Sequence, residues 1–188
     1  MAVLYVDQVD PQSGTTLTIG TSGDTVTVPS GVTVAGGLSN TPAFEAYLGA
    51  SQTFSDAATV KVNFNTEIFD SNSCYDNSTN YRFTPTEAGK YFVYSTLQMD
   101  GRSNSNLNII QILIYKNGSV YKENQSYFIS NYLRQQSVAT NAIIDMNGSS
   151  DYVEIYAYIS MISAASDARL QSGSNRNANF GAYKIIGA

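Results

Sequence analysis

Apolar and polar residues alternate with a period of two over most of the chain beyond residue 42. This pattern predicts β-strands, because successive side chains of a strand point to opposite faces. No segment shows the helical period of about 3.6 residues. The sequence therefore predicts an all-β jelly-roll sandwich of about ten strands. The expected strands span residues 44–48, 59–64, 81–84, 89–99, 107–115, 120–128, 133–146, 151–162 and 179–186.

Two Asn-Gly pairs mark the tightest predicted turns. A type I′ turn needs a positive φ angle at both central residues, and Asn followed by Gly adopts it readily. Asn117-Gly118 separates residues 107–115 from 120–128, and Asn147-Gly148 closes the long segment that starts at residue 133. Both pairs predict that the chain reverses direction.

Residues 15–37 are rich in Thr, Gly and Val, and their apolar residues form short alternating pairs such as Leu17/Ile19 and Val26/Val28. Strands this short cannot bury enough apolar surface alone. We therefore expect copies of the segment to wind around one another or to dock on a partner, with a flexible linker as the alternative. The chain divides into a β-rich attachment or stem segment, residues 1–41, and a knob, residues 42–188.

The predicted strand 151–162 is apolar on both faces, since its odd-numbered positions are mostly aliphatic and its even-numbered positions are rich in tyrosine. A sandwich strand in a monomer usually has one wet face, so we expect the second face to pack on a neighbouring subunit. Tyrosine suits such a seam because its ring buries area while its hydroxyl keeps a polar partner. The seam candidates are Tyr152, Tyr156 and Tyr158; the alternative is a central strand covered by long loops.

The chain is 43% hydrophobic but only 13% charged, and its ten Lys and Arg are scattered singly within a net charge of −5. Binding to nucleic-acid phosphates needs clustered cations, so no nucleic-acid partner is expected. No apolar run approaches the roughly 18 residues of a membrane span, and residues 1–7 lack the features of a secretory leader. We expect synthesis in a cytoplasm, and the single Cys74 fits a reducing compartment.

Six residues form a spaced motif of aromatic, acidic and glycine positions. They are Phe64, Asp70, Tyr75, Phe83, Gly89 and Tyr91. The motif resembles the signature of the complement-q globular domain, a jelly roll of the tumour-necrosis-factor superfamily. It departs from that signature by one additional residue between Tyr75 and Phe83 and by Val93 in place of Phe. Phe180 and Gly181 are similar to the aromatic-Gly-x-x-apolar close of the family's last strand, so the resemblance spans about residues 42–188.

The resemblance implies a jelly-roll knob that assembles as a homotrimer. The family's eukaryotic members are secreted and often carry a collagen-like stalk. In that place this chain has residues 15–37, which we call the Thr-Val-Gly segment. Residues 20–32 look like the N-terminal regions of structural proteins from tailed phages of marine bacteria, especially cyanophages. The combination of segment and knob resembles a phage virion structural protein.

Catalytic and metal-binding chemistry is poorly represented. The chain contains no His, the commonest general base and metal ligand, and Cys74 has no base to activate it. Asp70 and Asp76, with the Asn and Ser between them, could supply oxygen ligands for calcium, although such loops are more often solvated turns. We expect no catalytic residues, no enzyme activity and no cofactor.

Two functions remain open at this point. The first is a structural role on the virion surface, in which residues 1–41 bind other virion proteins and the knob projects as a capsid decoration or a short fibre. The second is an adhesin whose loops recognise a host-surface glycan or protein. A soluble cytokine-like ligand or a spore-coat protein is a weaker third class. We expect assembly in the host cytoplasm and a final location on the virion, on head or tail.

Overall fold

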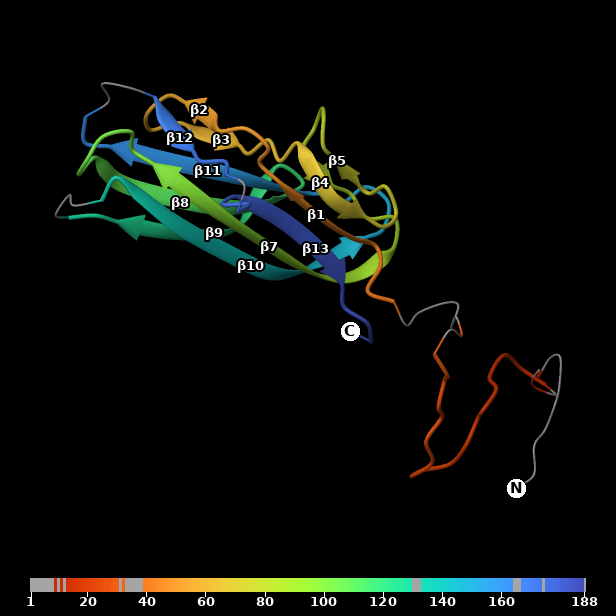
Figure 1. Ribbon diagram of the computed structural model, residues 1–188. Coiled ribbons are helices and arrows are strands. Elements are labelled where there is room, and N and C mark those ends of the chain that lie inside the picture. The colour runs from red at the N-terminus through yellow and green to blue at the C-terminus, as the bar shows by residue number, and fades with distance from the viewer. Residues whose placement is uncertain are drawn as a thin grey trace. The chain divides into compact units, whose positions relative to one another are not determined.

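The computed structural model describes residues 9, 11, 13–30, 32, 39–129, 133–163, 167–173 and 175–187. The chain forms two units, residues 1–37 and residues 38–188, and all the strands of the described residues belong to the second unit (Figure 1). No helix in the described part of the chain has the length and hydrophobicity that crossing a bilayer requires.

In the first unit, residues 13–30 contain bends and turns but no strand. The Asp24 carboxylate accepts a hydrogen bond from the Thr21 amide at 2.7 Å, which closes one turn. Leu17, Ile19 and Val26 are exposed. Residues 13–30 therefore form no strand in the single chain, and the winding or docking of several copies stays a prediction. The reason is that three- or four-residue strands without a partner bury too little apolar surface.

The second unit consists of two antiparallel sheets that pack face to face. Sheet A contains β1 (Ala43–Tyr47), β2 (Gln52–Phe54), β4 (Thr66–Asp70), β7 (Ala88–Asp100), β10 (Gln135–Asn147), β12 (Ala168–Leu170) and β13 (Asn179–Lys184). Sheet B contains β3 (Thr59–Lys61), β5 (Tyr75–Asp76), β6 (Arg82–Phe83), β8 (Leu107–Lys116), β9 (Ser119–Tyr127) and β11 (Val153–Met161). The chain crosses repeatedly between the sheets, as a jelly roll requires.

Long strands at the centre of each sheet organise the others. β7 pairs along its whole length with β10 on one edge, and with β13 and β12 on the other. β11 pairs with β8 on one edge, and with β6 and β3 on the other. Alternate residues of β7 and β11 point into the sandwich, and Tyr91, Val93, Ile155 and Ile159 are completely buried there.

Aromatic rings from both sheets meet around Phe44, which is fully buried. Its ring stacks on Tyr75 and Phe83 at centroid distances of 4.4 and 4.7 Å and meets Phe180 edge-on at 4.8 Å. Phe83 of sheet B in turn contacts Tyr91 of sheet A at 5.6 Å. These contacts join the two sheets through most of the aromatic residues of the sequence motif.

The beginning and end of the sandwich lie together. The Lys184 amide donates to the Pro42 carbonyl at 3.2 Å, and Ala43 pairs with Tyr183. We call this end the chain-end pole. β7 runs away from it, so Asp100 lies at the opposite end, where the connections at residues 101–106, 128–129, 133–134, 162–163, 167–173 and 175–178 gather. We call that end the loop pole.

The edges of the two sheets are joined by side chains. β9 is an edge strand of sheet B, and a bulge opposite Ile114 and Tyr115 turns Tyr121 toward β10. The Tyr121 hydroxyl donates to the Ile143 carbonyl at 3.1 Å, and Asn124 Nδ2 donates to the Ala139 carbonyl at 2.7 Å. These bonds satisfy carbonyls on the free edge of β10 that could otherwise pair with another strand.

The observed strands agree with most of the predicted ones, and the all-β jelly roll is confirmed. The Asn117-Gly118 turn has the predicted positive φ angles, 52° and 77°. At the second pair only Gly148 has a positive φ, 71°, and that connection crosses from sheet A to sheet B. The alternation missed β2, β4, β5 and β12, which have two to five residues each.

Candidate functional site

The loop between β4 and β6 uses its acidic side chains to fix its own backbone. The Asp70 carboxylate accepts hydrogen bonds from the amides of Cys74 and Tyr75 at 3.0 and 2.8 Å. Asp76 accepts from three successive amides, and the bond from Thr79 is the main reason that its pKa lies well below the usual range. Among the described residues no three His, Cys, Asp or Glu side chains gather as a metal site.

Cys74 lies in the same loop and is buried. Its sulfur is 3.7 Å from the Thr86 hydroxyl and 3.5 Å from the Asn72 carbonyl oxygen. These are packing contacts of a small, weakly polar side chain, and they offer no base for nucleophilic chemistry.

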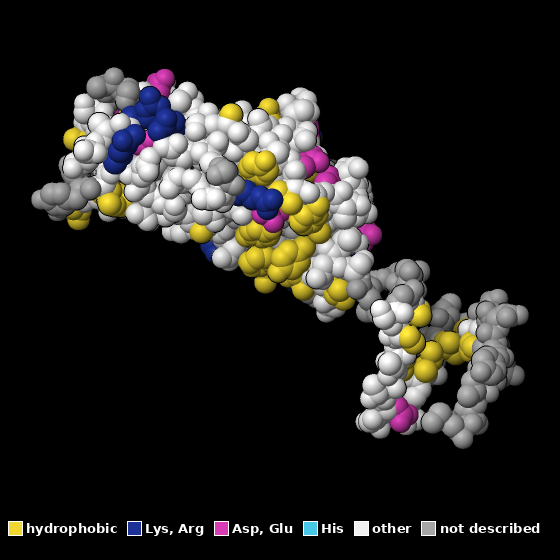
Figure 2. Space-filling view, in the orientation of Figure 1, with side chains coloured by type: hydrophobic (Ala, Val, Ile, Leu, Met, Phe, Trp, Pro, Cys, Tyr) yellow, Lys and Arg dark blue, Asp and Glu magenta, His cyan; other side chains and the backbone are white. Residues whose placement is uncertain are grey.

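The outer face of sheet A carries large apolar side chains from β4, β7, β10 and β13. Cross-strand pairs place Ile143, Phe92 and Tyr183 in one row and Tyr94 beside Phe92 along β7, while Phe69 lies opposite Glu45. Hydrophobic side chains gather over β1, β7 and β13 in Figure 2. We call these residues the aromatic face. Its members are Phe69, Phe92, Tyr94, Ile143 and Tyr183.

Gly181 shapes the centre of the aromatic face. A Cβ atom at this position would lie 2.4 Å from Cζ and Oη of Tyr94, so only glycine lets that ring lie across β13. The Tyr94 hydroxyl then donates to Glu45 at 3.1 Å. Burial, and secondly the Glu45 charge, raise the pKa of Tyr94 to about 12.

The outer face of sheet B holds two of the seam residues predicted from the sequence. Tyr156 and Tyr158 point outward from β11 and are half-buried. The Tyr156 ring stacks on Tyr115 at 4.0 Å, and Lys61 Nζ lies 5.9 Å from its centroid. Lys61 also pairs with the buried carboxylate of Glu154. We call this surface the tyrosine face.

The third predicted seam residue, Tyr152, lies at the chain-end pole and precedes β11. Its ring packs under the guanidinium of Arg82 at 4.4 Å, and its amide donates to Asn117 Oδ1 at 3.0 Å. Tyr152 occupies an even-numbered position, as Tyr156 and Tyr158 do, and it lies close enough to help raise the pKa of Tyr156, for which burial is the main cause. Which residues form a subunit seam stays a prediction.

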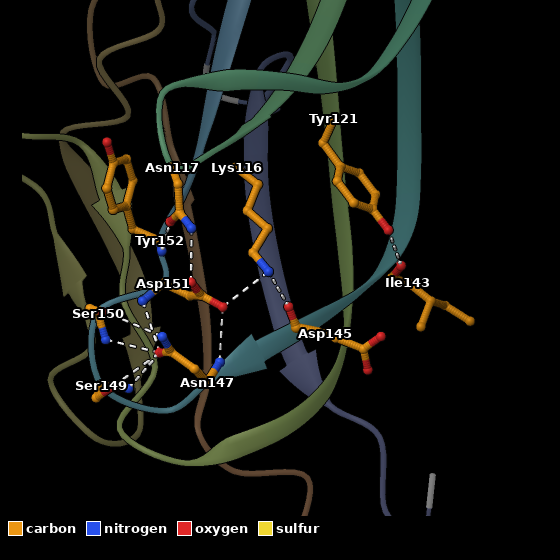
Figure 3. Close-up of polar contacts among 10 residues, drawn as sticks. All are labelled: Lys116, Asn117, Tyr121, Ile143, Asp145, Asn147, Ser149, Ser150, Asp151 and Tyr152. Atoms are coloured by element: carbon orange, nitrogen blue, oxygen red, sulfur yellow. Dashed lines mark hydrogen bonds and ion pairs between the residues drawn. The ribbon is translucent and has the colours of Figure 1, made fainter.

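A polar network ties the two Asn-Gly turns together at the chain-end pole (Figure 3). Asp151 accepts from Asn117 Nδ2 at 2.8 Å and pairs with Lys116 at 3.0 Å. Asn147 Oδ1 accepts hydrogen bonds from the amides of Ser149, Ser150 and Asp151. Because the donors and acceptors are paired with one another, the network is suited to holding the turns and leaves little for a ligand.

The loop pole has a shallow hollow on its sheet B side. Its lining residues are Asn108, Tyr127, Phe128, Ile129, Met161 and Ile162. Ile129 is almost fully exposed, and Tyr127 and Ile162 are more than half exposed. Asn106 is buried beneath the pole and fixes the loops, because its amide bonds to Gly101 and to both backbone groups of Ser163.

The residues of the sequence motif serve the scaffold. Phe64, Tyr75, Phe83, Tyr91 and Phe180 are buried in one cluster. Gly89 lies within β7 at a φ angle of +146°, a backbone conformation that residues with a side chain rarely adopt.

Sequence reasoning missed the aromatic face. It also missed the cluster at the loop pole in which Arg134 and Arg169 pair with Asp100. The aromatic-face residues alternate with buried residues on β7 and β13. The alternation predicted which side of each strand is buried. The aromatic residues at the opposite, outward positions were the sequence signal that could have revealed the aromatic face.

Comparisons with known proteins find relatives in structure and none in sequence. No protein-family model matches the chain, and no curated protein is significantly similar to it. The globular domain of zebrafish complement 1qA protein has a TM-score of 0.54 at 16% identity, covering 77% of this chain and 96% of that one.

Two further solved structures are about equally similar. The crystal structure of murine APRIL at pH 5.0 has a TM-score of 0.55 at 10% identity, covering 76% of this chain and 98% of that one. The Eiger TNF structure from S. frugiperda has a TM-score of 0.55 at 12% identity, covering 78% and 93%. At such identities the likeness establishes the fold, and the knob has the jelly-roll fold of C1q and tumour-necrosis-factor domains.

Proposed function

We propose that the chain is a non-enzymatic structural protein of a phage virion. In this proposal three copies assemble as a homotrimer, residues 1–41 hold it to other virion proteins, and the knob of residues 42–188 is exposed on the particle surface. The assignment to a phage rests on the Thr-Val-Gly segment and on the low content of charged residues. The jelly-roll fold supports the trimer that the sequence resemblance implies.

The aromatic face is the observation that carries self-association. Ile143 and Phe69 are 55% and 47% exposed, and Tyr183 is 38% exposed. Complete burial of one large apolar side chain stabilises by about 1.5–3 kcal/mol. Clustered residues of this kind on a sheet face usually mark an interaction surface. We therefore propose that the subunits meet at the aromatic face. The tyrosine face, which holds Tyr156 and Tyr158, is the alternative seam.

The two poles support an attachment through the N-terminus. The chain enters the knob at Pro42, which is bonded to the last strand at the chain-end pole. A particle that holds residues 1–41 would hold the knob by this pole. The loop pole would then be the end farther from the attachment point within the knob.

The mass of the protein in solution tests self-association directly. Light scattering at micromolar concentration should give three times the 20.3 kDa of one chain. A monomer of 20.3 kDa would overturn the homotrimer and remove the role assigned to the aromatic face.

A deletion tests the attachment segment. Removing residues 1–40 should leave a β-rich trimer that no longer joins particles, because the sandwich contains its own core. Circular dichroism, light scattering and particle incorporation measure the three properties. Normal incorporation of the shortened protein would show that residues 1–41 are not the anchor.

The adhesin is a second candidate, favoured by the fixed loops of the loop pole. Loops held on a rigid scaffold are common recognition sites. Purified protein should then compete with particles for adsorption to host cells, whereas a purely structural protein should leave adsorption unchanged.

A further inference from the structure

Asp100 is a fully buried carboxylate at the loop pole that holds two guanidinium groups. Its Oδ1 accepts from Arg134 Nε at 3.2 Å and from the Arg102 amide at 2.8 Å. Its Oδ2 accepts from Arg169 and, at 2.8 Å, from Gln171 Nε2. Burial alone would raise the pKa of Asp100, but these bonds outweigh it and lower the pKa to about 2. Asp100 is therefore ionised at neutral pH.

The cluster has more positive than negative charge. One carboxylate is bonded by Arg134 and Arg169, whose side chains are 46% and 24% exposed. Each guanidinium has five N–H donors, and Asp100 accepts from one nitrogen of each, so both keep further donors; one of these, Arg169 Nε, is buried without a hydrogen-bond partner among the described residues. Asp100 also holds the exposed Arg102 next to them, with its backbone at a φ angle of 70°. A left-handed backbone is unfavourable for arginine, and the hydrogen bond from the Arg102 amide to Asp100 stabilises it here.

The arginines of the chain are concentrated at the loop pole. Four of the five arginines, Arg102, Arg134, Arg169 and Arg176, lie at the loop pole, and all five lysines lie elsewhere in the sandwich. The Lys and Arg side chains visible in Figure 2 gather mainly near β12. The acidic residues of this pole are Asp56, Asp100 and Asp167, and the Asp56 carboxylate accepts from the Met161 amide. An anion would therefore meet its most favourable field at the Asp100 cluster.

The exposed residues beside the arginines are uncharged and polar. Residues 103–105 are Ser, Asn and Ser, and residues 135–136 are two Gln that follow Arg134. Hydroxyls and amides of this kind can donate and accept hydrogen bonds, as sugar hydroxyls require. The buried Asn106 holds the 101–106 loop in place, so the groups do not have to be ordered when a ligand binds.

We propose that the loop pole binds an acidic saccharide through its carboxylate group. In this proposal the exposed parts of the Arg134 and Arg169 guanidinium groups bind the carboxylate. Arg102 adds a third cation, and the Ser and Asn of residues 103–105 bind neighbouring hydroxyls. A long polyphosphate is disfavoured because the chain as a whole has a net charge of −5. The site lies within one subunit, so it does not depend on the homotrimer or on the virion role.

Binding of polygalacturonate to the full chain tests the proposal, with neutral dextran and duplex DNA as comparison polymers. We expect saturable binding of polygalacturonate that weakens with salt, and much weaker binding of dextran and DNA. Arg134→Gln should weaken binding tenfold or more, and Arg102→Gln several-fold. Arg82→Gln is the matched control, because it removes an arginine from the chain-end pole, and it should leave binding unchanged.

The Arg102 variant keeps the test valid if loss of Arg134 unfolds the protein. Only the backbone amide of Arg102 contacts Asp100, so Arg102→Gln should melt at the temperature of the wild type. The proposal is overturned if polygalacturonate does not bind, if dextran or DNA binds equally well, or if Arg82→Gln weakens binding as much as Arg102→Gln.

Discussion

The outer faces of sheet A and sheet B both carry aromatic side chains, but the rings have different partners. On the tyrosine face, Tyr156 stacks on Tyr115 and Lys61 approaches the same ring. On the aromatic face, Tyr183 packs against Phe92 at 5.5 Å and stays 38% exposed, and Ile143, on the other side of Phe92, is 55% exposed.

The difference shows where free energy for association remains. A ring that is already covered by neighbours in its own chain loses little further surface to water when a subunit docks. An exposed aliphatic or aromatic side chain loses much more, and stabilisation follows the apolar area removed from water. Under the proposed assignment, the exposure that is left after the chain has folded predicts the seam better than the composition of a face does.

The largest expected effect separates the inside of β11 from its outside. Ile155→Asp places a carboxylate at a completely buried position, and a buried unpaired charge is far more costly than a protein of this size can tolerate. The variant should fail to fold and should aggregate. The neighbouring Tyr156→Asp should fold, because Tyr156 faces outward and is only half-buried. Circular dichroism separates the two outcomes, and folded Ile155→Asp would contradict the assignment of the strand's faces.

A smaller effect is expected from Gly181→Ala, which disturbs the aromatic face from beneath. The added Cβ would meet the Tyr94 ring, and displacing that ring should destabilise the fold by about 1–3 kcal/mol. Thermal unfolding measures the loss. In a Tyr94→Ala background the same substitution should cost much less, since the obstructing ring is gone. Equal costs in both backgrounds would show that Tyr94 is not the cause.

The smallest effect is expected from Tyr94→Phe, which removes the hydrogen bond to Glu45. The loss should be about 1 kcal/mol at neutral pH. Because the pKa of Tyr94 is raised to about 12 in the folded chain, its contribution is complete below the ordinary tyrosine pKa and is lost as the pH rises through 12. An absorbance titration of the variant should lack one late-ionising tyrosine. Loss of a tyrosine that ionises near pH 10 would contradict this assignment.

Much of the fold could be predicted because short sequence patterns specify individual strands and turns. The alternation of residues 151–162 predicted the buried face that includes Ile155 and Ile159. The Asn117-Gly118 pair predicted a turn with two positive φ angles. β4 could not be found in this way, because its residues, Thr-Glu-Ile-Phe-Asp, place two apolar side chains in succession between polar ones.

The candidate sites depend on contacts between distant parts of the chain. The aromatic face joins Phe92, Ile143 and Tyr183 through the pairing of β7 with β10 and β13. The arginines around Asp100 come from three separate segments and appear in the sequence as scattered single cations. Only the register of the strands brings these residues together, and no short sequence pattern specifies it.

Sedimentation velocity of Ile143→Asp beside Tyr156→Asp tests the central claim most directly. Ile143 is 55% exposed in the single chain, so its substitution should leave each subunit folded while it places three carboxylates in the seam. We expect Ile143→Asp to need a protein concentration about tenfold or more higher than the wild type in order to assemble. At concentrations where the wild type is trimeric, the variant should therefore sediment as a folded monomer. Tyr156→Asp should remain trimeric. A trimeric Ile143→Asp together with a monomeric Tyr156→Asp would contradict the account and place the seam on the tyrosine face.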